Sequence, residues 1–203
     1  MGHESTAIVT EVLNSVAVVR FNRPLERNPL SRSTLFELKA VLTSVIPRQD
    51  INCIIFTGAA DVFLSGANIR ELEQLDPDNA LDFSKLGQGI FQQLANAPQT
   101  TIAAINGYCM GGGLDLALAC DIRIASPNAV FAHPGARLGI ITGWGGTQRL
   151  PGIVGKTAAL DMLLTAGRIS SDQALKLGLV TRMVGHPLEY ALALVKPTTS
   201  QSE

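Results

Sequence analysis

Apolar and polar residues alternate along residues 7–22 of the chain. A period of two is typical of half-buried strands, so this segment predicts a hairpin of two strands. Over residues 34–45 apolar side chains recur at helical spacing instead, and Thr34 followed by Glu37 predicts a helix that begins with a capping box. Residues 53–58 form a short continuous apolar run that ends on glycine, which indicates a strand buried on both faces.

The rest of the chain repeats this succession of strands and helices. Residues 59–68 are polar and contain glycine, which predicts a loop. Residues 81–97 show helical spacing, and Pro98 ends that helix. Strands that alternate with helices favour parallel pairing with helices packed outside, which is an α/β domain. The remaining predicted elements are helices at 114–120, 157–164 and 171–177, strands at 101–105, 121–125, 129–132 and 179–184, and a glycine-rich segment at 135–146.

Length and composition narrow the class of protein. The 203 residues fit one well-packed domain, and 46% hydrophobic with 16% charged residues indicates a globular chain. The 16 basic residues nearly balance the 17 acidic ones, so bulk charge attracts neither nucleic acid nor an anionic membrane. No apolar run reaches the ~18 residues that span a bilayer. Because the N-terminus also lacks a signal pattern, we expect a cytoplasmic protein without membrane or nucleic-acid partners.

The three cysteines, Cys53, Cys109 and Cys120, lie in apolar surroundings. They form no CxxC pair and have no histidine at ligand spacing. Cysteines in such surroundings behave as small apolar residues. We therefore expect reduced core thiols and no metal site.

Two glycine-containing segments, 63–71 and 104–116, follow predicted buried strands, where open α/β sheets bind ligands. The second contains three consecutive glycines, 111–113, before an apolar helix. Such a turn leaves backbone N–H groups uncovered at a helix N-terminus, which favours negative charge. The triple glycine alone fits a tight, close-packed turn equally well. Neither segment matches a dinucleotide or nucleoside triphosphate fingerprint, and a GxSxG nucleophile motif is absent.

Five separated segments between about residues 18 and 184 recur in the order and approximate spacing of one known family. The segments are Asn22-Arg23-Pro24 with Asn28, Phe63 with 65–69, 104–121, Leu138-Gly139 with 145–150, and 166–170 with Ala174 and 178–180. Together they resemble the crotonase (enoyl-CoA hydratase/isomerase) superfamily. The resemblance implies a spiral of strand-strand-helix turns, which replaces the simpler open sheet. It further predicts a core domain at 1–184, a truncated C-terminal helical part, and a short remnant at 185–203 that is partly frayed from Pro197 onward.

The resemblance implies a site for an acyl-CoA thioester, with coenzyme A as part of the substrate and no separate cofactor. By motif match, the backbone N–H groups of Ala67 and Gly112 would form an oxyanion hole that holds the thioester carbonyl and stabilises its enolate. The loop at 23–28 matches the segment that wraps the coenzyme A adenine and phosphates. The expected substrate-binding residues are Leu25, Arg27, Ser65, Asn68, Ile69, Arg70 and His133.

The expected catalytic carboxyl groups depart from the family pattern. Hydratases of the family use two glutamates as general base and acid, and the matching positions here are Asp115 and Gly135. Asp115 keeps a shortened carboxylate, although an acidic residue in the first turn of a helix is also favourable without any catalytic role. Gly135 has no proton to give. His133 could stand in as acid or base, or it could be a turn residue before Pro134 that is satisfied locally.

We therefore expect an enoyl-CoA hydratase/isomerase-type enzyme in which hydration is doubtful because of Gly135. Isomerisation or decarboxylation needs chiefly enolate stabilisation and one proton-transfer group. The alternative from another class is a non-catalytic acyl-CoA-binding or assembly protein. The family forms homotrimers, and the short C-terminus makes a tight trimer doubtful for this chain.

Overall fold

The computed structural model describes residues 6–195 and contains a large sheet with the strand order β1-β2-β4-β7-β9-β12. The predicted hairpin is confirmed, because β1 and β2 pair antiparallel, while every later neighbour in this sheet is parallel. Its strands are β1 (Ile8–Leu13), β2 (Val16–Phe21), β4 (Cys53–Thr57), β7 (Thr100–Ile105), β9 (Ile122–Ala125) and β12 (Arg182–Met183).

A smaller sheet has the order β11-β10-β8-β5, and a third pairing joins β3 to β6. Along the chain, β4, β7 and β9 of the large sheet are each followed by a strand of the small sheet and later by a helix, with β6 before the helix in the first case and a 3-10 turn in the third. This succession is the spiral of strand-strand-helix turns expected from the sequence. The strands are β3 (Pro29–Leu30), β5 (Val62–Leu64), β6 (Gly66–Ala67), β8 (Tyr108–Met110), β10 (Val130–Ala132) and β11 (Ile169–Ser170).

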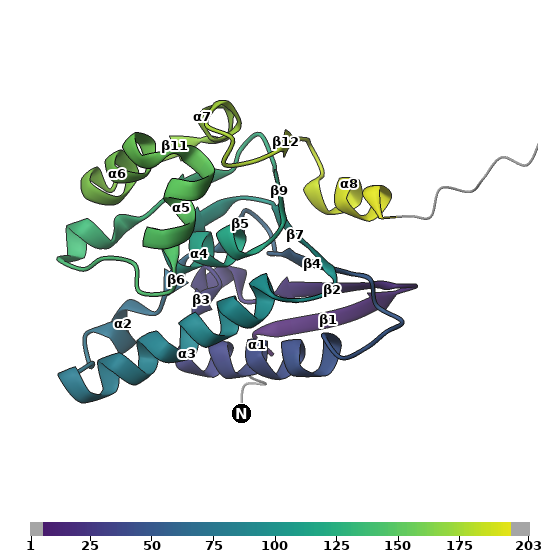
Figure 1. Ribbon diagram of the computed structural model, residues 1–203, viewed down its shortest axis with the longest axis horizontal. Helices are drawn as coiled ribbons and strands as arrows, with labels where there is room; N and C mark the ends of the chain where they lie inside the picture. Colours follow the sequence, from purple (N-terminus) through teal and green to yellow (C-terminus); the bar gives the residue numbers. More distant parts are fainter. Residues whose placement is uncertain (1–5, 196–203) are drawn as a thin grey trace, which may run out of the picture.

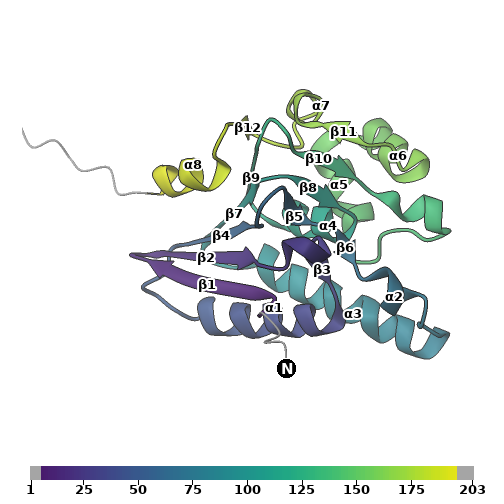
Figure 2. The ribbon, with the colours of Figure 1, turned by 180° about the vertical axis from the view of Figure 1, so that it is seen from behind.

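Helices cover both faces of the large sheet, with α1 and α3 together on one side and α8 on the other (Figures 1 and 2). The small α8 buries Ala191 against alternate residues of the central strands, which explains why those strands are continuously apolar. The helices are α1 (Arg32–Val45), α2 (Ile69–Leu72), α3 (Pro77–Ala95), α4 (Gly112–Ala119), α5 (Gly146–Val154), α6 (Lys156–Thr165), α7 (Ser171–Lys176) and α8 (Pro187–Leu194), with 3-10 turns η1 (Pro24–Glu26) and η2 (Pro134–Leu138).

Two helix starts differ from the sequence prediction. The capping box predicted at Thr34 and Glu37 is wrong, because Ser31 is the N-cap of α1 and accepts the backbone N–H of Thr34. The Glu37 carboxylate instead accepts the backbone N–H of Ile8 and ties α1 to the first strand. The helix predicted from residue 81 begins at Pro77, because Asp76 forms a capping box and proline suits the first helical position.

Two segments contain more structure than their composition predicts, and one contains less. The polar loop expected at 59–68 contains β5 and β6, whose partner strands lie far away in the sequence. The glycine-rich segment at 135–146 contains most of η2 and ends at the first residue of α5. The sequence pattern did not predict α5, because this helix begins with glycine and contains Pro151. Conversely, the strand predicted at 179–184 is reduced to β12. The fraying expected from Pro197 onward lies outside the described residues.

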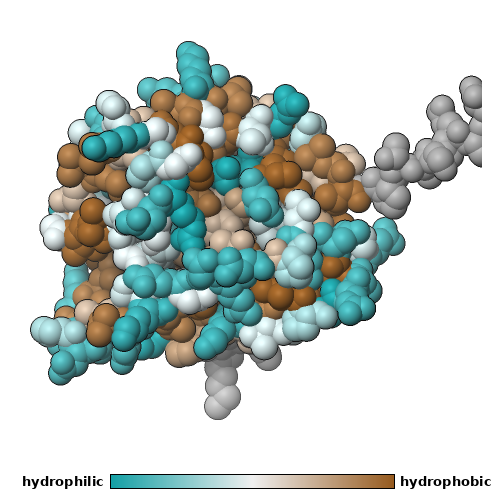
Figure 3. Space-filling view, viewed as in Figure 1, coloured by the Kyte–Doolittle hydropathy of each residue, from teal (hydrophilic) through white to brown (hydrophobic). Residues whose placement is uncertain are grey.

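The core contains the three cysteines, which are buried and unpaired as predicted. Burial raises the pKa of the Cys53 thiol to about 11, so this group stays protonated at neutral pH. Within residues 6–195 no helix is long and apolar enough to cross a membrane. Figure 3 shows apolar residues in separate patches among polar ones on the face seen in Figure 1.

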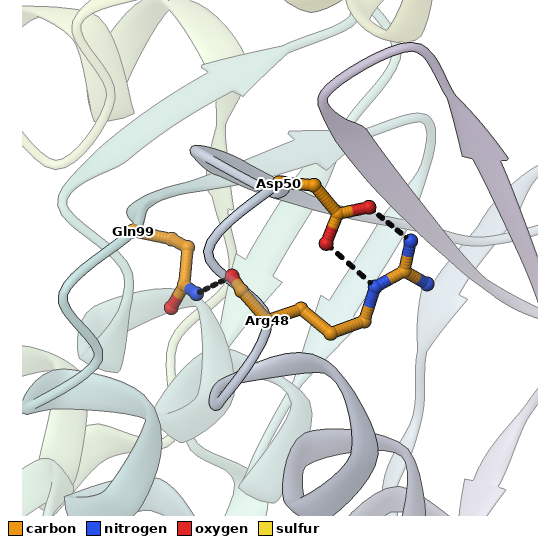
Figure 4. Close-up of polar contacts among 3 residues, drawn as sticks. All are labelled: Arg48, Asp50 and Gln99. Atoms are coloured by element: carbon orange, nitrogen blue, oxygen red, sulfur yellow. Dashed lines mark hydrogen bonds and ion pairs between the residues drawn. The ribbon is translucent and has the colours of Figure 1, made fainter.

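The end of the sheet where β4 and β7 begin is held by polar contacts (Figure 4). The Gln99 amide donates to the backbone carbonyls of Ile46 at 2.9 Å and Arg48 at 3.4 Å, which joins the end of α1 to the segment before β7. The Arg48 guanidinium pairs with Asp50 on the surface, where such pairs contribute little to stability.

Asn28 fastens the loop at residues 23–28 to the rest of the domain. Its buried amide donates to the carbonyls of Val62 and Phe63 at 3.0 and 3.1 Å, and its carbonyl accepts the backbone N–H of Arg23 at 2.7 Å. Its φ of 48° lies in the left-handed region, which asparagine adopts more readily than most residues. One side chain thus holds the loop and β5 together.

We predict that Asn28→Ala lowers the free energy of unfolding by roughly 2–4 kcal/mol, because the Arg23 N–H and the Phe63 carbonyl lose their side-chain partner and the Val62 carbonyl keeps only the Asn106 amide. Urea denaturation monitored by circular dichroism measures this change. The matched control is Asn22→Ala in the same loop, whose side chain carries none of these bonds, and a loss within about 0.5 kcal/mol is expected there. Equal losses in the two variants would contradict the role given to Asn28.

Candidate active site

A cavity of about 310 Å³ lies where the strands of the small sheet end. Its walls come from the segment after β5, from α2 and α3, from the N-terminus of α4, and from residues 133–144. The lining is mostly apolar, and Asp115 and His133 are its titratable groups. A largely apolar pocket with a few convergent polar groups is the usual form of a small-molecule site.

Two glycine turns meet backbone to backbone at the cavity. Gly66 has a φ of +97°, and a Cβ built on it would lie 2.8 Å from the carbonyl oxygen of Met110 and 3.1 Å from the backbone nitrogen of Gly112. A Cβ at Gly113 would lie 2.5 Å from Cβ of Leu64. Glycine is therefore required on both sides, and the contact brings the Ala67 turn against the first residue of α4.

Helix α4 begins at Gly112, so its first N–H groups have no partner within the helix. Every residue of α4 is buried, and α4 packs against α3 and α5 near the centre of the molecule (Figures 1 and 2). The helix therefore aims its positive end at a largely apolar cavity, where a developing negative charge is stabilised more strongly than in bulk solvent.

Asp115 is the one charged residue on α4 and is fully buried. Its carboxylate Oδ2 accepts a hydrogen bond from the Thr142 hydroxyl, and Oδ1 lies 3.5 Å from Nε2 of His133. Burial raises the pKa of Asp115 to about 7, opposed in part by the Thr142 hydroxyl, the Arg149 charge and the backbone of Trp144. A carboxyl group that titrates near neutral pH suits proton transfer.

His133 follows β10 and is 3% exposed. Burial lowers the pKa of its imidazole to about 4, so the ring is neutral at pH 7. Gly135 lines the same cavity as Asp115, as expected for the matching pair of positions. A Cβ at Gly135 would lie 2.8 Å from the carbonyl oxygen of Ile140, so the loop around residue 140 occupies the room that a side chain would need.

The structure divides the predicted site residues into two groups. Ser65, Ala67, Ile69, Gly112, Asp115, His133 and Gly135 all line the cavity. Leu25, Arg27, Asn68 and Arg70 lie outside it. Leu25 and Arg27 are exposed on η1 and at its end, and the Asn68 side chain caps α2 by accepting the N–H of Arg70. The Arg27 carbonyl accepts the N–H of Ser65 at 3.1 Å, so the η1 loop is joined directly to the cavity edge.

Thr142 and Trp144 are among the lining residues that the sequence analysis did not name as candidates. Thr142 binds Asp115, and Trp144 closes the inner wall of the cavity. The indole packs edge-on against Phe83 at 5.3 Å and Phe91 at 5.8 Å between ring centroids, and it fills the space beside Gly112. Both residues lie in the glycine-rich segment, and no local sequence pattern predicts that this segment packs across α4.

Within residues 6–195 no group of three His, Cys, Asp or Glu side chains is placed to hold a metal ion. The titratable groups that line the cavity are the Asp115 carboxyl group and the His133 imidazole.

Comparison with known proteins gives a consistent assignment. The family model described as enoyl-CoA hydratase/isomerase matches residues 11–196. A crotonyl-CoA hydratase of Syntrophomonas wolfei is 41% identical over 178 residues, which cover 87% of this chain and 68% of the relative. A short-chain-enoyl-CoA hydratase of Clostridium acetobutylicum is 40% identical over 89% of this chain and 70% of its own length. The crystal structure of an enoyl-CoA hydratase from Bacillus anthracis superimposes with a TM-score of 0.89 at 34% identity, over 93% of this chain and 75% of that one.

The contact of Gly112 with Trp144 leads to a first test of the site. We predict that Gly112→Ala lowers the free energy of unfolding by about 1–3 kcal/mol, because the new methyl group overlaps the indole and forces it or α4 to move. The control is Gly152→Ala on α5, where a Cβ meets open space and alanine is the better helix former. Thermal unfolding of both variants measures the difference.

A double-mutant cycle identifies the cause. Combining Gly112→Ala with Trp144→Leu removes part of the overlapping ring. The free energy of unfolding lost in the double variant should therefore be smaller than the sum of the losses in the two single variants, by more than about 0.5 kcal/mol. Strict additivity would show that the crowding lies elsewhere.

Proposed function

Because the chain belongs to the enoyl-CoA hydratase/isomerase family, we propose that it binds an acyl-CoA thioester in this cavity and stabilises the thioester enolate. In this proposal the backbone N–H groups of Ala67 and Gly112 hold the carbonyl oxygen. The observation that carries it is the backbone contact of the two glycine turns, which puts both residues at one wall of a largely apolar cavity. One such donor typically contributes about 3 kcal/mol of transition-state stabilisation.

The coenzyme A part is assigned to the surface beside the cavity. Leu25 is fully exposed on the η1 loop, and Arg27 follows it with a φ of 65° that holds the loop in a fixed turn. An exposed leucine offers an apolar face to an adenine ring, and a nearby arginine suits phosphate. Because the Ser65 N–H is bonded to this loop, the path from loop to cavity is short and runs past Ser65 and Ile69.

The acyl part is assigned to the apolar interior. Phe83 and Trp144 close the cavity at its inner end, while Leu138, Ile140 and Ile141 stand partly exposed at its edge. A closed apolar end limits the length of chain that can enter. This favours short acyl groups, in agreement with the names of two relatives, a crotonyl-CoA hydratase and a short-chain-enoyl-CoA hydratase.

The reaction is assigned to Asp115 as the acid/base group. Its buried carboxylate would take a proton from the acyl chain, and the electron pair of that C–H bond would delocalise onto the thioester oxygen held by the two N–H groups. Gly135 supplies no second carboxyl group. Isomerisation of a double bond by removal and return of one proton therefore fits the site better than addition of water, and decarboxylation fits for the same reason.

A non-catalytic acyl-CoA-binding protein is the second candidate, favoured by the glycine at position 135. Turnover separates the two. The catalytic proposal requires that the protein exchange α-protons of butyryl-CoA with deuterated water, measured by proton NMR. Binding without exchange or turnover would leave the binding role.

The oxyanion proposal predicts that a ligand stabilises the folded protein more strongly when the ligand carries a thioester carbonyl group. Acetoacetyl-CoA at about 100 times its dissociation constant should raise the melting temperature by roughly 5–10 °C, because only the native state binds. The matched comparison is butyryl-CoA against S-butyl-CoA, a thioether without the carbonyl. The thioester should give the larger shift. No shift with any thioester at millimolar concentration would reject the binding site itself.

The assignment of positions 115 and 135 to the catalytic pair predicts which substitutions increase hydration. Asp115→Glu combined with Gly135→Glu should raise hydration of crotonyl-CoA on the order of 100-fold, because it restores two proton-transfer groups. Gly135→Ala is the control, since it meets the same Ile140 carbonyl without adding a carboxyl group. If the double variant melts like its parent, binds the thioester and hydrates no faster, then positions 115 and 135 are not the catalytic pair.

A further inference from the structure

Asp115 and His133 reach each other from two parallel strands of the small sheet. Met110 of β8 is paired with Ala132 of β10, and the Gly111 N–H donates to the Ala132 carbonyl at 2.9 Å. His133 is therefore beside the turn that starts α4, and Asp115 lies one helical turn further on. The register of the two strands thus places both side chains in the same space, although the second half of α4 and the strands β9 and β10 separate them in the sequence.

The facing atoms of the pair have no other hydrogen bond. Oδ1 of Asp115 and Nε2 of His133 are both buried, lie 3.5 Å apart and make no hydrogen bond elsewhere within residues 6–195. Oδ2 is already bound to the Thr142 hydroxyl. A buried polar atom without a partner costs roughly 1–3 kcal/mol. A separation of 3.5 Å is long for an N–H···O bond, but a small rotation of either side chain closes it, and catalytic hydrogen bonds are often long before substrate binds.

The structure does not support the two non-catalytic interpretations of these residues. A locally satisfied turn histidine would bond its own turn, but the His133 side chain makes no capping bond to η2. A carboxylate that only stabilises a helix end would bond the first N–H groups of α4, whereas the Asp115 side chain is directed to Thr142 and His133. The side chains of Asp115 and His133 thus face each other and do not bond to the turns from which they come.

The geometry points to a proton-sharing pair: one proton lies between Oδ1 of Asp115 and Nε2 of His133, and His133 is the positioning residue of the proposed base. When Asp115 is ionised, Nε2 carries the proton and donates to Oδ1. When Asp115 is protonated on Oδ1, the neutral imidazole carries its proton on Nδ1 and Nε2 accepts. With the carboxyl proton on Oδ1, a proton on Nε2 would set two donors face to face, and with Asp115 ionised, a bare Nε2 would set two acceptors face to face.

The surroundings favour this neutral-imidazole arrangement. Burial lowers the pKa of His133 to about 4 and raises the pKa of Asp115 to about 7, so between these values the proton stays on the carboxyl group. The other charged or titratable groups that act on Asp115 within the described residues are Arg149 of α5 and the Cys109 thiol of β8. Arg149 favours the ionised carboxylate, and the Cys109 thiol is kept protonated by burial.

Gly146 leaves the room that the pair occupies. A Cβ at this first residue of α5 would overlap Oδ1 of Asp115 and lie 3.1 Å from Cε1 of His133. The catalytic consequence rests on the proposed function: His133 and Thr142 hold the two carboxylate oxygens, so a single oriented carboxyl group can take a proton from the acyl chain and return it.

The first experiment observes the pair without requiring activity. Nitrogen-15 NMR of the imidazole rings is simple here, because the chain has three histidines. As pH rises through about 7, where Asp115 ionises, the His133 Nε2 resonance should change from that of a bare nitrogen to that of a protonated one while the ring stays neutral. Asp115→Asn should abolish the change. A His133 tautomer that stays constant across this range would overturn the pair.

The second experiment tests the positioning role by two replacements of opposite character. Phenylalanine keeps the ring volume of His133 but has no hydrogen-bonding atom, whereas the glutamine amide can donate or accept by turning over. His133→Gln should therefore keep most of the α-proton exchange of butyryl-CoA. His133→Phe should lose roughly tenfold to 100-fold, and its pH profile should move to higher pH because the carboxylate has lost a donor.

A role in packing alone predicts the opposite order, with the phenylalanine variant retaining activity, and that order would reject the inference. His186→Gln, at the exposed start of α8, controls for the loss of a histidine far from the cavity. If the parent neither binds nor exchanges any thioester, the proposed function fails, and the NMR titration still decides whether the pair exists.

Discussion

The close approach of two backbone turns is the constraint on which the rest of the site depends. The carbonyl of Met110 and the nitrogen of Gly112 lie where a side chain on Gly66 would be, and Leu64 lies where one on Gly113 would be. Only glycine permits such contacts, and glycine also adopts the positive φ of residue 66 without steric cost. The turn after β5 and the start of α4 therefore form one continuous wall. That wall presents backbone donors to the cavity, and the Asn28 side chain ties the adjoining surface loop to it.

A second consequence follows from the position of α4. A helix that begins at this contact lies in the interior, and its residues are buried on all sides. Such a helix has to be apolar all round, which makes Asp115 an expensive exception. Its cost is lowered by Thr142 and, in our proposal, by His133. The same burial that makes the carboxyl group costly brings its pKa to about 7, the range in which a carboxyl group can both accept and release a proton.

The family fold is thus retained, while in our proposal the acid/base groups differ from the hydratase pattern. Gly135 lines the cavity without a side chain, and the loop near Ile140 has closed over that space. Fold similarity to hydratases therefore establishes the architecture, whereas the reaction depends on which groups remain in the cavity. A single carboxyl group with an imidazole beside it is suited to moving one proton at one face of a bound enolate.

The sequence by itself determined the α/β class, the hairpin and the buried β4, because periodicity and apolar runs are local signals. The family motifs predicted a spiral fold and seven residues that do line the cavity, and the roles given to them stay predictions. Only the tertiary structure decided that β5 and β6 are strands, since their partners are distant in the chain. It alone brought Thr142 and Trp144 to the site and faced His133 toward Asp115. Those contacts arise from the register of β8 against β10 and from the fold of a glycine-rich loop across α4, and neither leaves a periodic pattern in the sequence.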